Sequence, residues 1–400
     1  MQALPDIARH KPELAIGRME AVQTPIIAVI ADLIKDQPGT ISLGQGVVHY
    51  GPPPAAIERV RTLDYAGDIH KYGPTGGIEQ LCELMAAKLA AENGIRTGPE
   101  CRVIVTAGSN MAFLHALFAS TRPGDEIILP VPYYFNHEMA IAMLDCRAVL
   151  VPTTKDYLPE PDAIRRAITP RTRAIVTVSP NNPSGMVYSE DCLREINAIC
   201  SNHGLYHISD EAYEYFTFAG ARHFSPGSIA GAERHTISLY SLSKAYGFAH
   251  WRIGYMVAPA HLVTALYKAQ DTNLICPPIV SQYAAIGAME AGRSYCEQKL
   301  ASIKDVRDIF LAELKGSTAF CSLSAGNGAF YFLLKIDTGL DDMTVTRRLI
   351  SEHRVAVIPG HTFGFTKGCY LRVSYGALDG QNAREGIIRL THGLKAVVKY

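Results

Sequence analysis

The sequence predicts an α/β protein in which a mainly parallel, seven-stranded sheet is sandwiched by helices and is accompanied by a smaller α+β domain. Short apolar runs rich in β-branched residues alternate with longer helical patterns, which favours parallel strands joined by helices. Several of the runs are almost continuously hydrophobic, as is typical of strands buried on both faces. After about Pro259 the pattern changes to long helices followed by a few strands.

Seven runs have the length and composition of strands of one sheet. They are residues 103–106, 126–129, 148–151, 172–178, 205–209, 236–240 and 253–257. Helical spacing of apolar residues lies between them, for example at 111–120, 161–167 and 189–202. This alternation predicts a sheet that these helices cover.

A different pattern follows residue 259. One helical pattern runs to residue 291 and a second from 294 to 316, and strands are expected at 329–336 and 370–375. The expected division is an N-terminal segment (1–48) joining the small domain, a large domain (49–290) and a small C-terminal domain (291–400). No repeat or Pro/Ser-rich linker marks these boundaries, and the helices between 260 and 316 could bridge the two parts.

Composition narrows the possible classes of protein. The chain has 400 residues, 48% of them apolar, and a formal net charge of zero, which fits a soluble two-domain protein. Binding to nucleic acid or to an anionic membrane through bulk charge is not expected. The nine cysteines form no C-x-x-C pair or zinc spacing, so we expect reduced thiols in the cytoplasm and no metal. Neither a signal peptide nor a membrane span is expected.

The most informative residue is Lys244, in the segment 241–254 (SLSKAYGFAHWRIG). The predicted strand 236–240 ends just before it, so its amine is expected at a strand end among hydroxyl groups, with Arg252 eight positions later. Such a group can bind an aldehyde-bearing phosphate cofactor: the amine forms an imine, and the serines and the arginine bind the phosphate. A lone lysine is more often a solvated surface residue, so the other motifs must decide.

Residues 241–254 match the pattern S-x-[SA]-K-x-x-G-x-x-x-x-R-x-G at every fixed position. The sequence therefore resembles the class I and II aminotransferases, which use pyridoxal 5′-phosphate and have fold type I. The resemblance implies that Lys244 forms the Schiff base and that residues 49–290 are the cofactor-binding domain. It also implies that the phosphate is bound by Ser241, Ser243 and Arg252.

Asp210 follows the predicted strand 205–209, at the edge of the sheet where open α/β folds bind their ligands. It begins the sequence Asp-Glu-Ala-Tyr, which resembles the D-x-A-Y motif of the family. The resemblance implies that Asp210 pairs with the cofactor's ring nitrogen and that Tyr213 donates to its phenolic oxygen. A helix N-cap aspartate and an ordinary core tyrosine are the alternatives.

Asn182 lies in an Asn-Pro-Ser-Gly sequence directly after the apolar strand 172–178. Such a sequence is by itself a common turn. Its place before Asp210 matches the family's N-P-[TS]-G element, which implies that Asn182 bonds the same phenolic oxygen and borders the substrate.

The segment Gly108-Ser109-Asn110 follows a strand and begins a helix, so its backbone N–H groups can bind a phosphate. No G-K-[ST] follows, which excludes a Walker loop, and His49 replaces the third glycine that a dinucleotide fingerprint after Gly44 would need. A helix N-terminus alone is more often structural; the resemblance implies that Gly108, Ser109 and Asn110 bind the phosphate.

Two tyrosines are assigned by the resemblance. Tyr134 is expected to stack on the cofactor ring, with Tyr133 as the competing choice. Tyr72, in a Y-x-P-x-G element, is expected to reach the phosphate of a second subunit, which implies a homodimer. Cys82 replaces the arginine usual in that element.

Arg372 lies on the alternating strand 370–375, where an arginine is usually solvated. The family's L-R-[ILV]-[SN] motif instead implies a bidentate clamp on the substrate's α-carboxylate, which lysine cannot reproduce. Gly46 is expected to offer its backbone to the same carboxylate. The segment 46–50 departs from the family's G-x-P-D-F, so substrate specificity is the least predictable property.

The resemblance implies a transferase that moves an amino group from an L-amino acid to a 2-oxo acid by ping-pong chemistry. Lys244 would move the α-proton, so its free amine must be neutral. We expect burial and the Arg252 cation to lower its pKa from about 10.4.

Two alternative functions remain at this stage. A lyase or cyclase of the same fold, such as a C–S lyase or an aminocyclopropane-carboxylate-synthase-like enzyme, uses the same lysine, aspartate and arginine. A regulatory module that kept the fold is disfavoured, since no helix-turn-helix precedes the matching region. The donor is also open: the segment 44–54 resembles the kynurenine, glutamine and aromatic branch, and apolar surface is expected from Tyr50, Phe248 and Trp251.

Overall fold

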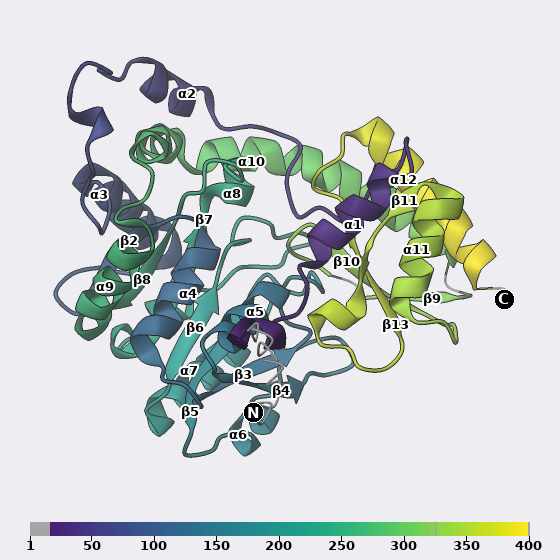
Figure 1. Ribbon diagram of the computed structural model, residues 1–400, viewed down its shortest axis with the longest axis horizontal. Helices are drawn as coiled ribbons and strands as arrows, with labels where there is room; N and C mark the ends of the chain where they lie inside the picture. Colours follow the sequence, from purple (N-terminus) through teal and green to yellow (C-terminus); the bar gives the residue numbers. More distant parts are fainter. Residues whose placement is uncertain (1–16, 318, 325, 399–400) are drawn as a thin grey trace, which may run out of the picture.

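The computed structural model describes residues 17–317, 319–324 and 326–398, and its centre is a seven-stranded sheet (Figure 1). The strands are β2 (Cys101–Thr106), β3 (Glu126–Val131), β4 (Arg147–Pro152), β5 (Thr172–Val178), β6 (Tyr206–Asp210), β7 (Thr236–Ser241) and β8 (Gly254–Pro259). Their order is β2-β8-β7-β6-β5-β3-β4, and β8 runs in the direction opposite to that of the other six strands. The predicted mainly parallel sheet and all seven of its strands are confirmed.

Helices cover both faces of this sheet, as the continuous hydrophobicity of the strands predicts. Ile127 and Ile128 are neighbours on β3 and both are fully buried, yet they belong to different core clusters. The Ile127 face is covered by α4 (Ser109–Ser120), α5 (Phe135–Met143) and α9 (Val263–Leu274). The Ile128 face is covered by α6 (Pro161–Arg166) and α7 (Glu190–His203).

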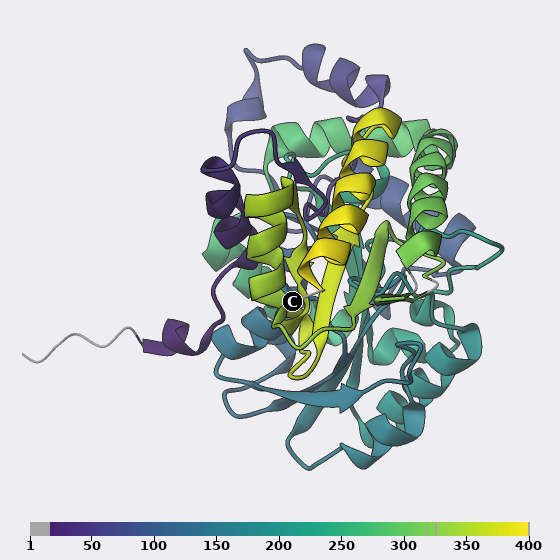
Figure 2. The same cartoon turned by 90° about the vertical axis from the view of Figure 1, so that its right-hand side faces the viewer.

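The C-terminal part contains a second, antiparallel sheet of four strands in the order β12-β13-β10-β9. These are β9 (Cys321–Leu323), β10 (Tyr331–Ile336), β12 (Ile358–Pro359) and β13 (Cys369–Ser374). The two strands expected there correspond to β10 and β13. Figure 2 shows α11 (Asp342–His353) and α12 (Gly380–Val397) on the face of this sheet that is turned away from the large sheet.

Helix α10 (Ile279–Leu314) connects the two parts, as expected for helices of this region (Figure 1). It packs on α2 (Pro54–Arg61) and α3 (Glu79–Lys88), and further along on α12. It is broken at Gly292 (φ 64°), which matches the gap expected between 291 and 294. The expectation of one helical pattern from 260 to 291 is wrong, because Pro277 and Pro278 separate α9 from α10.

The N-terminal segment lies on the C-terminal part of the molecule. Strand β1 (Ile41–Ser42) pairs in parallel with β11 (Val355–Ala356). Helix α1 (Ile26–Lys35) places Ile26 and Ile30 in a cluster with Ile358 and Phe363. The domain boundaries at 48 and 290 stay predictions.

The part of the expected N-terminal segment that precedes residue 17 lies outside the described residues, as does the expectation of no signal peptide. Within the described ranges, none of the helices has the length and apolarity that crossing a bilayer requires.

Candidate active site

A pocket of about 270 Å³ lies where the parallel strands β5, β6 and β7 end. The last residue of each strand, Val178, Asp210 and Ser241, lines it, as expected for the carboxyl edge of an open α/β sheet. Ten of the predicted site residues line this pocket: Ser109, Asn110, Tyr134, Asn182, Asp210, Tyr213, Ser241, Ser243, Lys244 and Arg252. They come from six separate segments of the sequence.

Lys244 lies on the short helix α8 (Leu242–Ala245), directly after β7. Its Nζ donates to the carbonyl oxygen of Gly46 at 2.6 Å. Burial of the amine, with the nearby cations of Arg372 and Arg252, lowers the pKa of Lys244 from 10.5 to about 8, against an opposing effect of Asp210. The expected direction of this pKa shift is confirmed, and Arg372 is a cause that the sequence did not indicate.

Asp210 is buried, and its Oδ2 lies 3.1 Å from Nε2 of His137, while Oδ1 accepts from the N–H of Ala212. His137, on α5, is buried and stacks on the ring of Phe113 with centroids 4.0 Å apart. Sequence reasoning missed His137. Tyr134 is the N-cap residue of α5 and His137 lies three residues later in its first turn, so this spacing could have indicated that the two side chains are neighbours.

Tyr213 and Asn182 lie together, with Asn182 Nδ2 3.5 Å from the Tyr213 hydroxyl oxygen. Burial, with contributions from Tyr331 and Tyr134, raises the pKa of Tyr213 well above 10, so it is a protonated phenol at neutral pH. The Tyr331 hydroxyl, from β10, lies 2.8 Å from that of Tyr213. Tyr331 was also missed, since it belongs to no motif.

The N-terminus of α4 and the side chain of Arg252 face each other across Gly108. Gly108 has φ 83°, and a Cβ there would lie 2.4 Å from Nη2 of Arg252. Gly108 is the N-cap residue of α4 and has no side chain that could cap the helix. The Arg252 guanidinium donates only to the backbone carbonyls of Ala249 and Ala107, and none of the described carboxylates pairs with it. Open N–H groups beside an unpaired cation make an anion site.

Arg372 is only 2% exposed, so the alternative of a solvated strand arginine is wrong. Its Nη1 donates to Asn182 Oδ1 at 2.9 Å and its Nη2 to the Gly44 carbonyl at 2.6 Å. The guanidinium carbon lies 4.6 Å from the ring centre of Tyr331 and 5.2 Å from that of Phe363. No carboxylate within the described ranges forms an ion pair with it, and a buried unpaired cation favours an anionic ligand.

Of the two remaining tyrosines that were assigned, Tyr134 lies at the pocket and Tyr72 does not. Tyr134 lines the pocket and its hydroxyl accepts from Asn136, whereas Tyr133 is buried against Gly364 and Phe363. Tyr72 is 79% exposed and lies at another surface cavity, away from the pocket of its own chain. Its role toward a second subunit stays a prediction.

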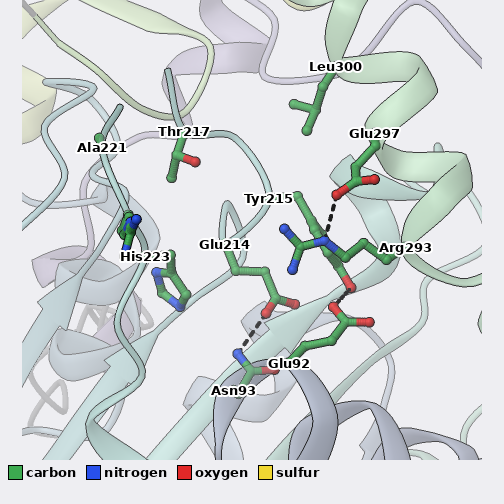
Figure 3. Close-up of a pocket in the computed structure, with 11 residues that line it drawn as sticks. Glu92, Asn93, Glu214, Tyr215, Thr217, Ala221, His223, Arg293, Glu297 and Leu300 are labelled. Carbon is green, nitrogen blue, oxygen red and sulfur yellow. Dashed lines mark hydrogen bonds and ion pairs between the residues drawn. The ribbon is translucent and has the colours of Figure 1, made fainter. Parts of the chain in front are cut away.

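A different cavity, of about 400 Å³, shares no lining residue with this pocket (Figure 3). Its polar side chains largely satisfy one another. Asn93 donates to Glu214 and the Tyr215 hydroxyl donates to Glu92. Arg293 donates to Glu297. None of the predicted site residues lines this second cavity.

Comparison with known proteins identifies the family. Residues 38–390 match the family described as aminotransferase class I and II. The chain is 35% identical over 385 residues to aromatic aminotransferase ISS1 of Arabidopsis thaliana, covering 94% of this chain and 95% of that protein. It is 35% identical over 362 residues to aspartate/prephenate aminotransferase of Thermus thermophilus, covering 88% and 91%.

A solved structure of an aromatic aminotransferase from Pyrococcus horikoshii superposes with a TM-score of 0.84 at 32% identity, covering 92% of this chain and 99% of that one. Sequence and fold agree over nearly the whole length. The chain belongs to the class I and II aminotransferases of fold type I.

Proposed function

We propose that this aminotransferase binds pyridoxal 5′-phosphate and transfers the amino group of an aromatic L-amino acid to a 2-oxo acid. One observation carries the choice of donor. Lys244 and Arg252 line the pocket, and Arg372 donates to Asn182 in its wall. In this proposal Lys244 moves a proton, Arg252 binds the cofactor's phosphate and Arg372 binds the substrate's α-carboxylate. Among the described residues lining the pocket, no further cation is available for the second carboxylate of a dicarboxylic donor. The similarity to aromatic aminotransferases supports the same choice.

The residues present fit the cofactor. Its phosphate fits the anion site formed by Ser109, Asn110, Arg252 and the serines Ser241 and Ser243. Asp210, held by His137, can face a protonated ring nitrogen, and the Tyr134 ring can stack on the pyridine. Pyridoxal phosphate, when bound, supplies an aldehyde that reacts with amines and a ring that accepts electrons from the substrate's α-carbon.

The chain's own residues then position the substrate and move one proton. Arg372 binds the α-carboxylate through two parallel hydrogen bonds. Lys244 takes the α-proton of the amino acid on its Nζ. It holds this proton and releases it again later in the reaction. With a pKa of about 8, roughly a tenth of the free amine is neutral at pH 7 and half at pH 8. Tyr213 stays protonated and donates its hydrogen into the pocket.

The remaining expectations belong to the same proposal. A homodimer is supported by the large, exposed apolar side chains of Tyr72, Ile275 and Val280, which lie close together because Gly73 contacts Cys276 and Ile279. A cytoplasmic location is supported by the nine cysteines, all of which are free thiols. The aminotransferase relatives favour transamination over a lyase or cyclase reaction.

A panel of donors against 2-oxoglutarate and pyruvate tests the proposal. Phenylalanine, tyrosine, tryptophan and kynurenine should give a kcat/KM at least about 10-fold above that of aspartate, a difference of about 1.4 kcal/mol. A higher value for aspartate would contradict the donor assignment. With an amino acid alone, the enzyme should stop after one equivalent, whereas repeated turnover would indicate a lyase.

A further inference from the structure

Tyr331 touches both groups to which the proposed function gives the central binding roles. It lies on β10, in the C-terminal part of the chain, is 1% exposed, and contacts Tyr213, which lines the pocket. Its hydroxyl oxygen is 2.8 Å from that of Tyr213, and its ring centre is 4.6 Å from the guanidinium carbon of Arg372. A single side chain thus contacts Tyr213, which would bind the cofactor, and Arg372, which would bind the substrate.

Either hydroxyl can donate in the bond between the two tyrosines, and the proposed function selects the direction. Burial raises the pKa of both phenols, so each is protonated and carries one hydrogen. If Tyr213 donates its hydrogen into the pocket, the hydrogen in the 2.8 Å bond must come from Tyr331. Asn182, the other donor near Tyr213, is more distant, at 3.5 Å.

We propose that Tyr331 is a positioning residue with two separable actions. Its hydroxyl donates to Tyr213 and so directs the Tyr213 hydrogen toward the cofactor's phenolic oxygen, and its ring holds the Arg372 guanidinium in place for the substrate carboxylate. This inference rests on the proposed function.

Gly46 leaves room for the Tyr331 hydroxyl because it has no side chain. A Cβ on Gly46 would lie 2.5 Å from that hydroxyl oxygen, closer than van der Waals contact allows. The carbonyl of the same glycine accepts from Lys244. Replacing Gly46 would therefore displace the Tyr331 hydroxyl without removing it, which gives a second way to disturb the same bond.

Two substitutions separate the actions. Tyr331→Phe removes the hydroxyl and keeps the ring; Tyr331→Leu removes both. Tyr375→Phe is the matched control, because Tyr375 is fully buried and its hydroxyl bonds the Ala329 carbonyl instead of a pocket residue. The measurements are the pH midpoint of the holoenzyme's visible absorbance and the dissociation constant of 3-phenylpropionate, a carboxylate without an amino group.

In Tyr331→Phe the absorbance midpoint should rise by roughly 0.3 to 1 pH unit, the effect of one hydrogen bond, with the dissociation constant within twofold of wild type. Gly46→Ala should raise the midpoint in the same direction. Tyr331→Leu should also weaken 3-phenylpropionate binding by at least about fivefold. Tyr375→Phe should change neither quantity.

An unchanged midpoint in Tyr331→Phe would overturn the role of the hydroxyl. Equal loss of 3-phenylpropionate binding in Tyr331→Phe and Tyr331→Leu would overturn the role of the ring. A wild-type protein that stays colourless with pyridoxal phosphate would overturn the proposed function itself, which distinguishes the two failures.

Discussion

At the scale of residues, the pocket depends on cations that lack acid partners. Arg372 lies near Lys244 and is the larger of the two cationic influences that lower the Lys244 pKa. The same guanidinium has no carboxylate partner within the described chain, and we propose that it binds the substrate's carboxylate. In this proposal one buried charge contributes both to a neutral lysine and to substrate binding.

Arg372→Lys keeps the positive charge and loses the planar pair of donors. We expect kcat/KM to fall roughly 100-fold or more for every amino acid and oxo acid alike, because all share the α-carboxylate. Steady-state kinetics across the donor panel checks this. A loss confined to one donor would instead indicate that Arg372 reads the substrate's side chain.

The lowered pKa of Lys244 has a consequence for stability. Between pH 8 and 10.5 the unfolded chain binds a proton at this amine that the folded apoprotein does not, so stability rises with pH across that window. Across this window the free energy of unfolding should increase by about 3 kcal/mol because of this amine. Measured by urea unfolding, the increase between pH 8 and pH 10.5 should be larger by this amount in the wild-type apoprotein than in Lys244→Met. Parallel curves would show that the amine is not buried as described.

Many residues of the candidate site could be predicted from the sequence, because they lie in short motifs at the ends of strands. Lys244, Asp210 and Asn182 each follow a recognisable apolar run. His137 and Tyr331 could not be predicted in this way, because their importance arises only through contacts made in the folded chain. Tyr331 meets Tyr213 across 118 positions of sequence.

At the scale of elements, the long buried strands could be predicted and the shortest could not. Strands β1, β11 and β12 have two residues each, and no periodicity can be read from two residues. The separation of α9 and α10 was missed although Pro277 and Pro278 mark it, since apolar periodicity continues on both sides. The uncapped N-terminus of α4, by contrast, is where the sequence predicts it.

Gly108→Ala tests the role of the α4 N-terminus. The added methyl group would clash with Arg252, so the affinity for pyridoxal phosphate should fall at least about 10-fold. Alanine would also have to adopt the positive φ of Gly108, which should cost roughly 1 kcal/mol of stability.

Gly204→Ala is the matched control for that substitution. Gly204 ends α7 with φ 64° and has open space around it. This variant should lose similar stability while binding the cofactor normally. Equal loss of cofactor affinity in both variants would contradict a specific role for Gly108.

At the scale of the whole molecule, the N-terminal segment and α10 join the two parts. The segment adds β1 to β11, and α10 contacts α2, α3 and α12. Residues of the two parts meet at the site, where Arg372 on β13 donates to Asn182 after β5. The second, four-stranded sheet could be predicted from the change of pattern near residue 259, but these contacts could not.

Subunit complementation tests the proposed dimer. Tyr72→Ala and Lys244→Ala should each lower activity strongly as homodimers. If Tyr72 serves the neighbouring site, mixed and reassociated chains should recover about a quarter of the wild-type sites, since half the dimers carry one intact site. No recovery after mixing, with heterodimers present, would contradict the shared site.

The central claim is that Lys244 binds pyridoxal phosphate covalently, and borohydride reduction followed by peptide mass spectrometry tests it most directly. The account predicts a single phosphopyridoxyl adduct on the peptide containing Lys244, absent from Lys244→Ala. A colourless protein without an adduct, or an adduct on another lysine, would contradict it.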